Sequence, residues 1–310
     1  MKRKNFKSIA GLTLIEILIG VVVSSIMMAA IYTTYSIVNT TYSQVLEKAK
    51  VSRSSRDIIE LLIRDTRMAG FKYYLGDNDL GLPKESYLEF VGGASSIQES
   101  HDPIVIIPQQ LGHSIEDTIP TPPQKHNLLD SCCDKIHIVY DDFNQNDDTQ
   151  PYKRYKLTYF ARPLSDTDRD GNIINQRYGI YKSKISWEQD IGQEEGEWVA
   201  DCSECYHNEL IRDYVEDMEF IALDKDGKVL TPYPNTLTEE SRRNLYKIRA
   251  IDIRIAFISE KPFFRFESRQ GKERQLTGFS RTPRSFSDRN LRDNVVVTVY
   301  TRNIVGQDIF

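Results

Sequence analysis

Residues 11–32 read GLTLIEILIGVVVSSIMMAAIY, and this stretch decides how the chain is organised. Its only charge is Glu16, and no further charged residue occurs until Glu47. An apolar run of roughly 20 residues, rising about 1.5 Å per residue, is long enough to cross the hydrocarbon core of a bilayer as one helix. The stretch therefore predicts a single membrane-spanning helix.

The basic residues near this helix all precede it, at Lys2, Arg3, Lys4 and Lys7. Because Lys and Arg are retained in the cytoplasm, the N-terminus is expected inside the cell and everything after about Tyr32 outside. A secretory signal would instead have a shorter apolar core of roughly 7 to 15 residues before a small-residue cleavage site. The bulk of the chain is thus predicted to be exported while it stays anchored.

The helix is predicted to continue far beyond the membrane. No proline occurs before Pro83, and Gly70 is placed to end the helix with a positive φ. A helix from Leu12 to about Ala69 would be about 90 Å long. Apolar residues recur at helical spacing in its second half, with five near one face: Val45, Ala49, Ile59, Leu62 and Ile63.

Glu16 is an unusual residue for a membrane span, because a carboxylate at mid-membrane costs about 2.5 kcal/mol or more. Together with Gly11, Leu12 and Thr13 behind a short basic leader, it resembles the prepilin cleavage motif. That resemblance implies cleavage after Gly11 by a prepilin peptidase and N-methylation of Leu12 as the new first residue. It also implies that Glu16 pairs with the N-terminal amine of a neighbouring subunit.

Electrostatics supports such a pairing, since opposite charges about 4 Å apart attract by several kcal/mol at an intermediate effective dielectric, which offsets the burial of each. The alternative is a plain anchor helix in which Glu16 lies near the cytoplasmic interface and has no role.

Four segments resemble the minor pilins called PilW: Arg64–Phe71, Leu210–Phe220, Ala250–Phe257 and Val295–Asn303. The resemblance implies a minor pilin of type IV pilus assembly, in a priming or tip complex with other minor pilins and the major pilin. It also implies contact with the assembly platform in the bacterial inner membrane, and later a place in the pilus at the cell surface. The alternatives are a J-type pseudopilin of a type II secretion tip and an adhesive or DNA-binding pilus component.

The exported part reads as β-rich. Ile251, Ile253, Ile255 and Phe257 alternate with polar or small residues, as expected of a half-buried strand. Further strands are predicted around residues 136–140, 155–159, 178–185, 215–223 and 295–300, with a hairpin turn at 224–227.

The predicted fold is α+β and pilin-like, with the long helix packed on an antiparallel sheet. The domain plan has four parts: a leader at 1–11, a transmembrane helix at 12–34, its distal half at 35–70 and a periplasmic domain at 71–310.

The cysteines occur as two tight pairs, Cys132 with Cys133 and Cys202 with Cys205. In an oxidising compartment they predict disulfides rather than a zinc site, around which adjacent cysteines fit poorly. Because a bridge between adjacent residues is strained, we expect either two bridges between the pairs or Cys202–Cys205 alone.

Asp166, Asp168 and Asp170 alternate before Gly171 and resemble the start of a calcium-binding loop. Arg177 stands where such a loop has its bidentate glutamate, so the loop is incomplete. The alternative is a solvated hairpin, and no other cofactor is expected.

The net charge of −5 over 310 residues argues against a surface devoted to nucleic acid. In residues 188–224 acidic residues greatly outnumber the one basic residue, Arg212, whereas residues 261–292 hold nine Lys and Arg residues, and this asymmetry suits contacts between subunits. The basic segment also has the cations and phenylalanines that single-stranded nucleic acid binding uses. Nucleic acid is not expected as a partner, but the candidates for it are Lys261, Arg265, Arg269, Lys272 and Arg274.

Nothing in the sequence resembles a nucleotide-binding loop, a zinc-protease motif or a nucleophile elbow, and the five histidines are scattered. We therefore expect an assembly component and not an enzyme.

Overall fold

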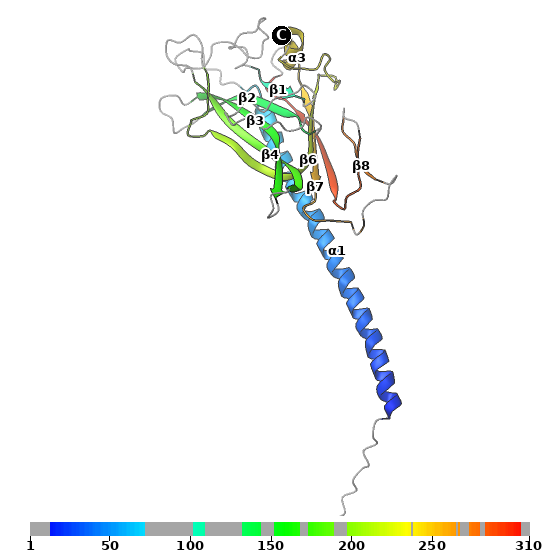
Figure 1. Cartoon of the computed structure of the whole chain (residues 1–310). Coiled ribbons are helices and arrows are strands. Elements are labelled where there is room, and N and C mark those ends of the chain that lie inside the picture. The colour runs from blue at the N-terminus through cyan, green and yellow to red at the C-terminus, as the bar shows by residue number, and fades with distance from the viewer. Residues whose placement is uncertain are drawn as a thin grey trace, which may run out of the picture. The chain divides into compact units, whose positions relative to one another are not determined.

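The computed structural model describes residues 13–71, 102–108, 132–143, 152–167, 173–188, 197–236, 238–264, 266, 273–279 and 283–304 (Figure 1). The chain forms two compact units, Met1–Ala49 and Lys50–Phe310. The first contains only helix among its described residues from Leu14 onward, and the second contains the sheet.

Helix α1 runs from Leu14 to Met68, 55 residues without a break. Gly70 ends it with a φ of 71°, and its N–H donates to the carbonyl of Val139 at 2.9 Å. Glycine is suited to this position because it adopts positive φ without a Cβ clash. The predicted helix and its glycine end are confirmed.

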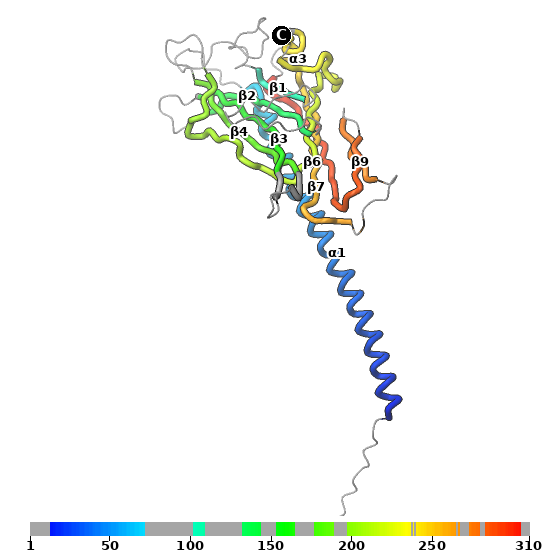
Figure 2. The backbone as a smooth tube through the Cα atoms, viewed as in Figure 1, coloured from blue at the N-terminus to red at the C-terminus, as the bar shows by residue number. Residues whose placement is uncertain are grey.

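An eight-stranded antiparallel sheet makes up most of the second unit, in the order β1-β2-β3-β4-β6-β7-β10, with β5 paired to β4 (Figures 1 and 2). Its strands are β1 (Ile104–Ile107), β2 (Lys135–Phe143), β3 (Tyr152–Thr167), β4 (Ile173–Glu188), β5 (Glu197–Val199), β6 (Tyr206–Leu223), β7 (Ala250–Ile258) and β10 (Arg292–Tyr300). A short helix, α3 (Glu239–Leu245), precedes β7, and β8 (Arg274–Leu276) and β9 (Arg284–Phe286) form a separate hairpin.

Within the second unit, the last turns of α1 pack on one face of the sheet. Ile58 and Leu62 are buried with the strand residues that point to the same side, such as Tyr159, Ile253 and Val299. These strand residues alternate with neighbours on the other face, as a period of two requires. The predicted α+β plan of a long helix on an antiparallel sheet is confirmed, and the core accounts for the apolar alternation in the sequence.

The predicted turn at 224–227 is also present. Asp224 donates its N–H to the carbonyl of Lys228 at 2.9 Å, and its Oδ1 accepts the N–H groups of Asp226 and Lys228. Gly227 has a φ of 74°, a value that favours glycine. The turn lets Leu223 form a bridge with Val229.

Strand β7 departs from the expected half-buried pattern, because both of its faces are covered. Arg254, which the alternation placed on the outer face, is buried. A guanidinium is buried only when it is paired, so a polar network must lie on that face.

Candidate functional site

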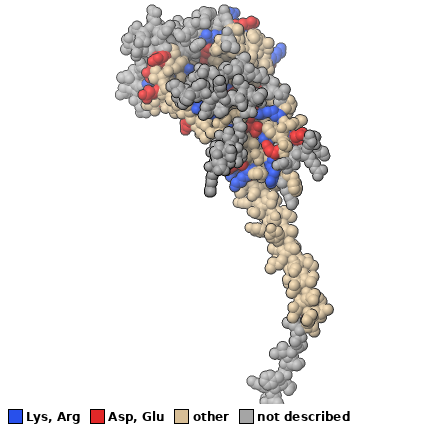
Figure 3. Space-filling model, in the orientation of Figure 1, with Lys and Arg blue, Asp and Glu red and all other residues tan. Residues whose placement is uncertain are grey.

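Among the described residues of the first compact unit, the helix presents an exposed apolar surface. Large apolar side chains from Leu14 to Leu46 are exposed, and helix α1 contains a stretch long and apolar enough to cross a membrane. In Figure 3 the visible face of this part of the helix carries no charged side chain. So much exposed apolar surface needs a bilayer or other apolar helices around it.

Glu16 lies in the first turn of α1, where it forms a capping box with Thr13. The backbone N–H and the hydroxyl of Thr13 both donate to Glu16 Oε2 at 2.8 Å. The Glu16 N–H in turn lies 3.4 Å from Thr13 Oγ1. This local role was missed at first, although the spacing of threonine and glutamate before an apolar run is its usual sequence signal.

Gly11 and Leu12, the predicted cleavage and methylation positions, lie outside the described residues. The described helix therefore begins two residues after the predicted cut. Cleavage and methylation stay predictions.

The predicted basic segment forms what we call the basic arm, namely the described residues between β7 and β10. The backbone N–H groups of Phe263 and Phe264 donate to the carbonyl of Arg289 at 2.8 and 2.9 Å, and that of Ser259 donates to the carbonyl of Leu291 at 2.8 Å. These bonds hold the two ends of the arm together, and Figure 2 shows it as the orange segment beside the sheet.

The arm is bound to the sheet by charge. Arg284, in the arm, lies 3.7 Å from both Glu216 and Asp217 of β6. Arg292, the first residue of β10, lies 3.3 Å from Glu216 and forms a bidentate pair with Asp288 of the arm at 2.7 and 2.8 Å. The acidic and basic segments that were expected to meet between subunits thus neutralise each other, in part, inside one chain.

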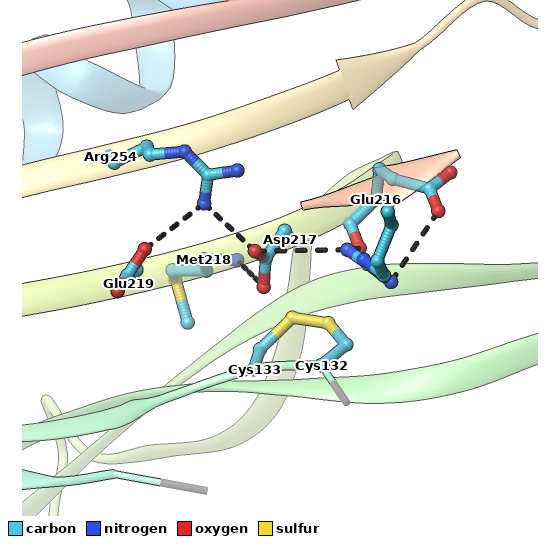
Figure 4. Close-up of a disulfide and its surroundings, with 8 residues drawn as sticks. Cys132, Cys133, Glu216, Asp217, Met218, Glu219 and Arg254 are labelled. Carbon is cyan, nitrogen blue, oxygen red and sulfur yellow. Dashed lines mark hydrogen bonds and ion pairs between the residues drawn. A yellow bond between two sulfur atoms is a disulfide. The ribbon is translucent and has the colours of Figure 1, made fainter. Parts of the chain in front are cut away.

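Beneath the arm, Arg254 Nη1 bridges two carboxylates on β6, at 2.8 Å from Asp217 and 3.2 Å from Glu219 (Figure 4). Glu219 also accepts the N–H of Phe279 at 2.8 Å, so the arm itself completes the network. Because this face is shielded from water, each buried charge on it needs a partner of opposite charge or a hydrogen bond to offset its desolvation cost. The network is a structural joint between sheet and arm.

Two acids of the joint have shifted pKa values. Burial raises the pKa of Glu216, against the opposing effect of Arg292 and Arg284. At Asp288 burial acts in the same upward direction, but hydrogen bonds from Arg292 and from the Asn290 N–H outweigh it and lower the pKa.

Two of the nucleic-acid candidates, Arg274 and Lys261, are among the described residues. The Arg274 guanidinium lies 3.6 Å from the centre of the Phe264 ring and donates to the carbonyl of Asp288, so it is used within the arm. Lys261 is exposed at the base of the arm. Arg265, Arg269 and Lys272 lie outside the described residues.

The cysteines form two bridges, Cys132–Cys133 and Cys202–Cys205. The second is one of the expected arrangements, and a turn in which the Cys205 N–H donates to the Cys202 carbonyl brings the Cα atoms to 4.9 Å. The expectation of bridges between the pairs, and the argument against a bond between neighbours, were wrong.

The reason lies in β6. Asp134, next to Cys133, donates its N–H to the carbonyl of Met218, whereas Cys205 precedes the first residue of the strand, Tyr206. About 40 Å of strand separates these positions, and a disulfide joins Cα atoms only about 4.4–6.8 Å apart.

Within the described residues, one group of side chains could suggest a metal: Cys132, Cys133 and Asp217, whose ligand atoms lie within 4.8 Å of one another. The two sulfurs are bonded to each other, and metal binding needs thiolates. Asp217 is paired with Arg254. The group therefore does not fit a metal site.

The predicted calcium loop connects two long paired strands. Asp166 is in β3 with its backbone opposite Asn175 of β4, and Thr167 is opposite Ile173. Asp168 and Asp170 lie outside the described residues. Calcium binding stays a prediction.

Neither a protein-family model nor a curated protein sequence matches the chain. Among solved structures, the chain is similar to a type IV-like pilin from Thermus thermophilus, with a TM-score of 0.37 and 12% identity over 82% of this chain and 96% of that one. Similarity at this level carries no argument about function, which must be drawn from the chain's own residues.

Proposed function

We propose that this protein is a minor pilin that takes part in type IV pilus assembly, in a priming or tip complex with other minor pilins. The observation that carries the proposal is a bare apolar helix with one carboxylate, Glu16, in its first described turn. Gly11, Leu12 and a basic leader precede that turn, and a folded antiparallel domain follows the helix. This combination supports a subunit that moves from the bilayer into a bundle of similar helices.

In the proposed mechanism, the prepilin peptidase cuts after Gly11 and leaves Leu12 as a methylated amine. Among the described residues, Glu16 uses Oε2 to hold Thr13 and keeps its carboxylate at the end of the helix. Oε1 then faces the amine of a neighbouring helix. An ion pair at this depth fixes the register between helices, because an unpaired carboxylate among apolar groups costs several kcal/mol.

The domain would bind sibling minor pilins outside the membrane, and assembly motors would then extract the complex and add major subunits beneath it. The basic arm is a poor DNA-binding surface in this proposal, because Arg274 and Arg284 already have partners in the chain. No catalytic step is proposed.

The first test is N-terminal sequencing and intact mass of the membrane-extracted protein, with and without the cognate prepilin peptidase. We expect a chain that starts at methylated Leu12 only when the peptidase is present, and an uncut chain when Gly11 is replaced by valine. An uncut wild-type chain, or a cut near Ala30, would refute the assembly proposal.

A second test separates the pilus from the secretion system. Deletion of the gene should abolish surface pili and leave exoprotein release intact. Loss of exoprotein release with normal pili would identify a type II secretion pseudopilin instead.

A further inference from the structure

A lysine and an aspartate meet inside the second unit, where α1 packs on the sheet. Lys182 Nζ, from β4, lies 2.7 Å from Asp65 Oδ2, from the last turn of α1. Both side chains are almost fully buried, at 7% and 6% exposure. The pair is therefore sequestered from water and held at contact distance by two rigid elements.

The other contacts of this carboxylate distinguish its two oxygens. Tyr159 donates its hydroxyl to Asp65 Oδ2, the oxygen that Lys182 also contacts. Arg64 Nε donates to Oδ1 at 3.1 Å. Burial, followed by the charge of Asp65 and the hydrogen bond to it, raises the pKa of Tyr159, so this phenol keeps its proton.

We propose that Lys182 and Asp65 condense to an amide, an isopeptide bond that joins α1 covalently to β4. Lys182 first passes a proton to Asp65 Oδ2, which gives a neutral amine and a neutral acid. The amine nitrogen then attacks Asp65 Cγ, and the N–C bond forms as Oδ1 takes negative charge beside Arg64.

The tetrahedral centre then collapses. A second proton from the nitrogen reaches Oδ2, which the Tyr159 hydroxyl already contacts, and the Cγ–Oδ2 bond breaks. One ammonium and one carboxylate become one amide and one water, with no oxidant, reductant or other reactant. Three groups that contact the carboxylate supply what the reaction needs: a nucleophile in Lys182, a donor to the leaving oxygen in Tyr159 and a cation at the remaining oxygen in Arg64.

Burial favours this reaction, which is unfavourable for free amines and acids in water. Each buried ion of a pair carries a desolvation cost, whereas an amide is neutral. Two groups held in contact also react as if at effective molarities of about 10⁵ M or more. The rings of Tyr159 and Tyr206 lie 5.3 and 5.8 Å from Lys182 Nζ and help to keep water away.

Such a bond would have a mechanical role that goes beyond the proposed function. Any force applied along α1 must pass to the sheet through the contacts of its last turns. A covalent bond at Asp65 prevents the helix from separating from β4. Without that bond, only noncovalent contacts oppose the separation.

The test is a tryptic map of the full chain, purified from membranes and reduced. Cleavage after Arg64 and Arg67 releases residues 65–67, and an acylated Lys182 resists trypsin, so residues 178–184 stay in one piece. We expect a single species that joins 65–67 to 178–184 and weighs one water less than their sum. Fragmentation should place the bond between Asp65 and Lys182.

Two variants sharpen the result. Lys182→Arg keeps the charge and the reach but has no nucleophilic amine, so its joined peptide should be absent and its intact mass should fit its sequence without loss of water. Lys184→Arg, on the same strand, should retain the bond. A wild-type map with free 65–67 and with cleavage after Lys182 would overturn the proposal, whatever the variants do, and would leave the leader-cleavage test unaffected.

Discussion

Replacing Arg254 by methionine should destabilise the second unit severely. The guanidinium of Arg254 is the group that bridges Asp217 and Glu219 on the outer face of the sheet, at 2.8 and 3.2 Å. Methionine retains much of the apolar volume of the arginine stem, so the cavity term should be small. What is lost is the positive charge between two buried carboxylates.

The size of the effect depends on which partners the two carboxylates retain after the substitution. Breaking a buried ion pair by removing one partner costs about 3–5 kcal/mol. Asp217 keeps Arg284 at 3.7 Å, and Glu219 keeps the Phe279 N–H at 2.8 Å. We therefore expect the low end of that range, about 3 kcal/mol of unfolding free energy.

The assay is urea unfolding of the full chain in detergent, followed by tryptophan fluorescence. The two tryptophans, Trp187 and Trp198, lie on paired positions of β4 and β5 and report on the sheet. Arg302→Met, at an exposed position, is the matched control and should change the free energy by less than about 0.5 kcal/mol.

A triple variant tests the cause. Arg254→Met with Asp217→Leu and Glu219→Gln removes both buried charges, and Gln keeps an acceptor for Phe279. Because apolar replacement of a whole buried ion group is often neutral, the triple variant should regain most of the lost stability. A single variant within 1 kcal/mol of wild type, or a triple variant that is less stable than the single one, would refute the electrostatic reasoning.

Three further predictions concern Glu16 at the start of α1, the apolar core and the basic arm. Glu16→Gln should still be cut after Gly11 but should fail to support piliation, because a neutral amide cannot pair with a neighbour's amine; normal pili by electron microscopy would contradict this. Leu62→Ala should lower the unfolding free energy by about 2–5 kcal/mol in the urea assay, since Leu62 is fully buried where α1 packs on the sheet. Val229→Ala, at an exposed position, should lower it little. Asp288 has a lowered pKa, so its stabilisation is present above its unfolded pKa of about 3.9 and is lost as pH falls through the folded value. Asp288→Asn should therefore be less stable than wild type at pH 6, as measured by the urea midpoint, and this difference should shrink as pH falls through the folded pKa of Asp288. A difference that does not change with pH would count against the Arg292–Asp288 pair.

Local sequence patterns were sufficient to predict the helix and the strands. The apolar run after Gly11, the absence of proline before Pro83 and the glycine at 70 define α1, because each acts within a turn or two of helix. The alternation of Ile251, Ile253 and Ile255 defines β7 in the same way, since neighbouring side chains of a strand point to opposite faces. The helix cap that Thr13 forms with Glu16 was not predicted, although its three-residue spacing is an equally local signal.

The charged residues could not be assigned from the sequence with the same success. The sequence predicted that Arg254 faces solvent and that the basic segment contacts partners. Both predictions failed in part because the sequence does not reveal which segment covers the outer face of a strand. The arm reaches β6 only through the fold, where Arg284 lies 3.7 Å from Asp217 and the Phe279 N–H donates to Glu219. It thereby covers the face on which Arg254 pairs with both carboxylates.

By itself, then, the sequence determined a β-rich domain on a long helix that starts with an apolar, prepilin-like stretch, since hydrophobic periodicity and short motifs are local properties. Only the tertiary structure decided which cysteines are close enough to bond, which arginines have partners and that Lys182 meets Asp65. Those outcomes depend on strand register and on the packing of α1 against the sheet, which bring together residues far apart in the chain and which no local pattern encodes.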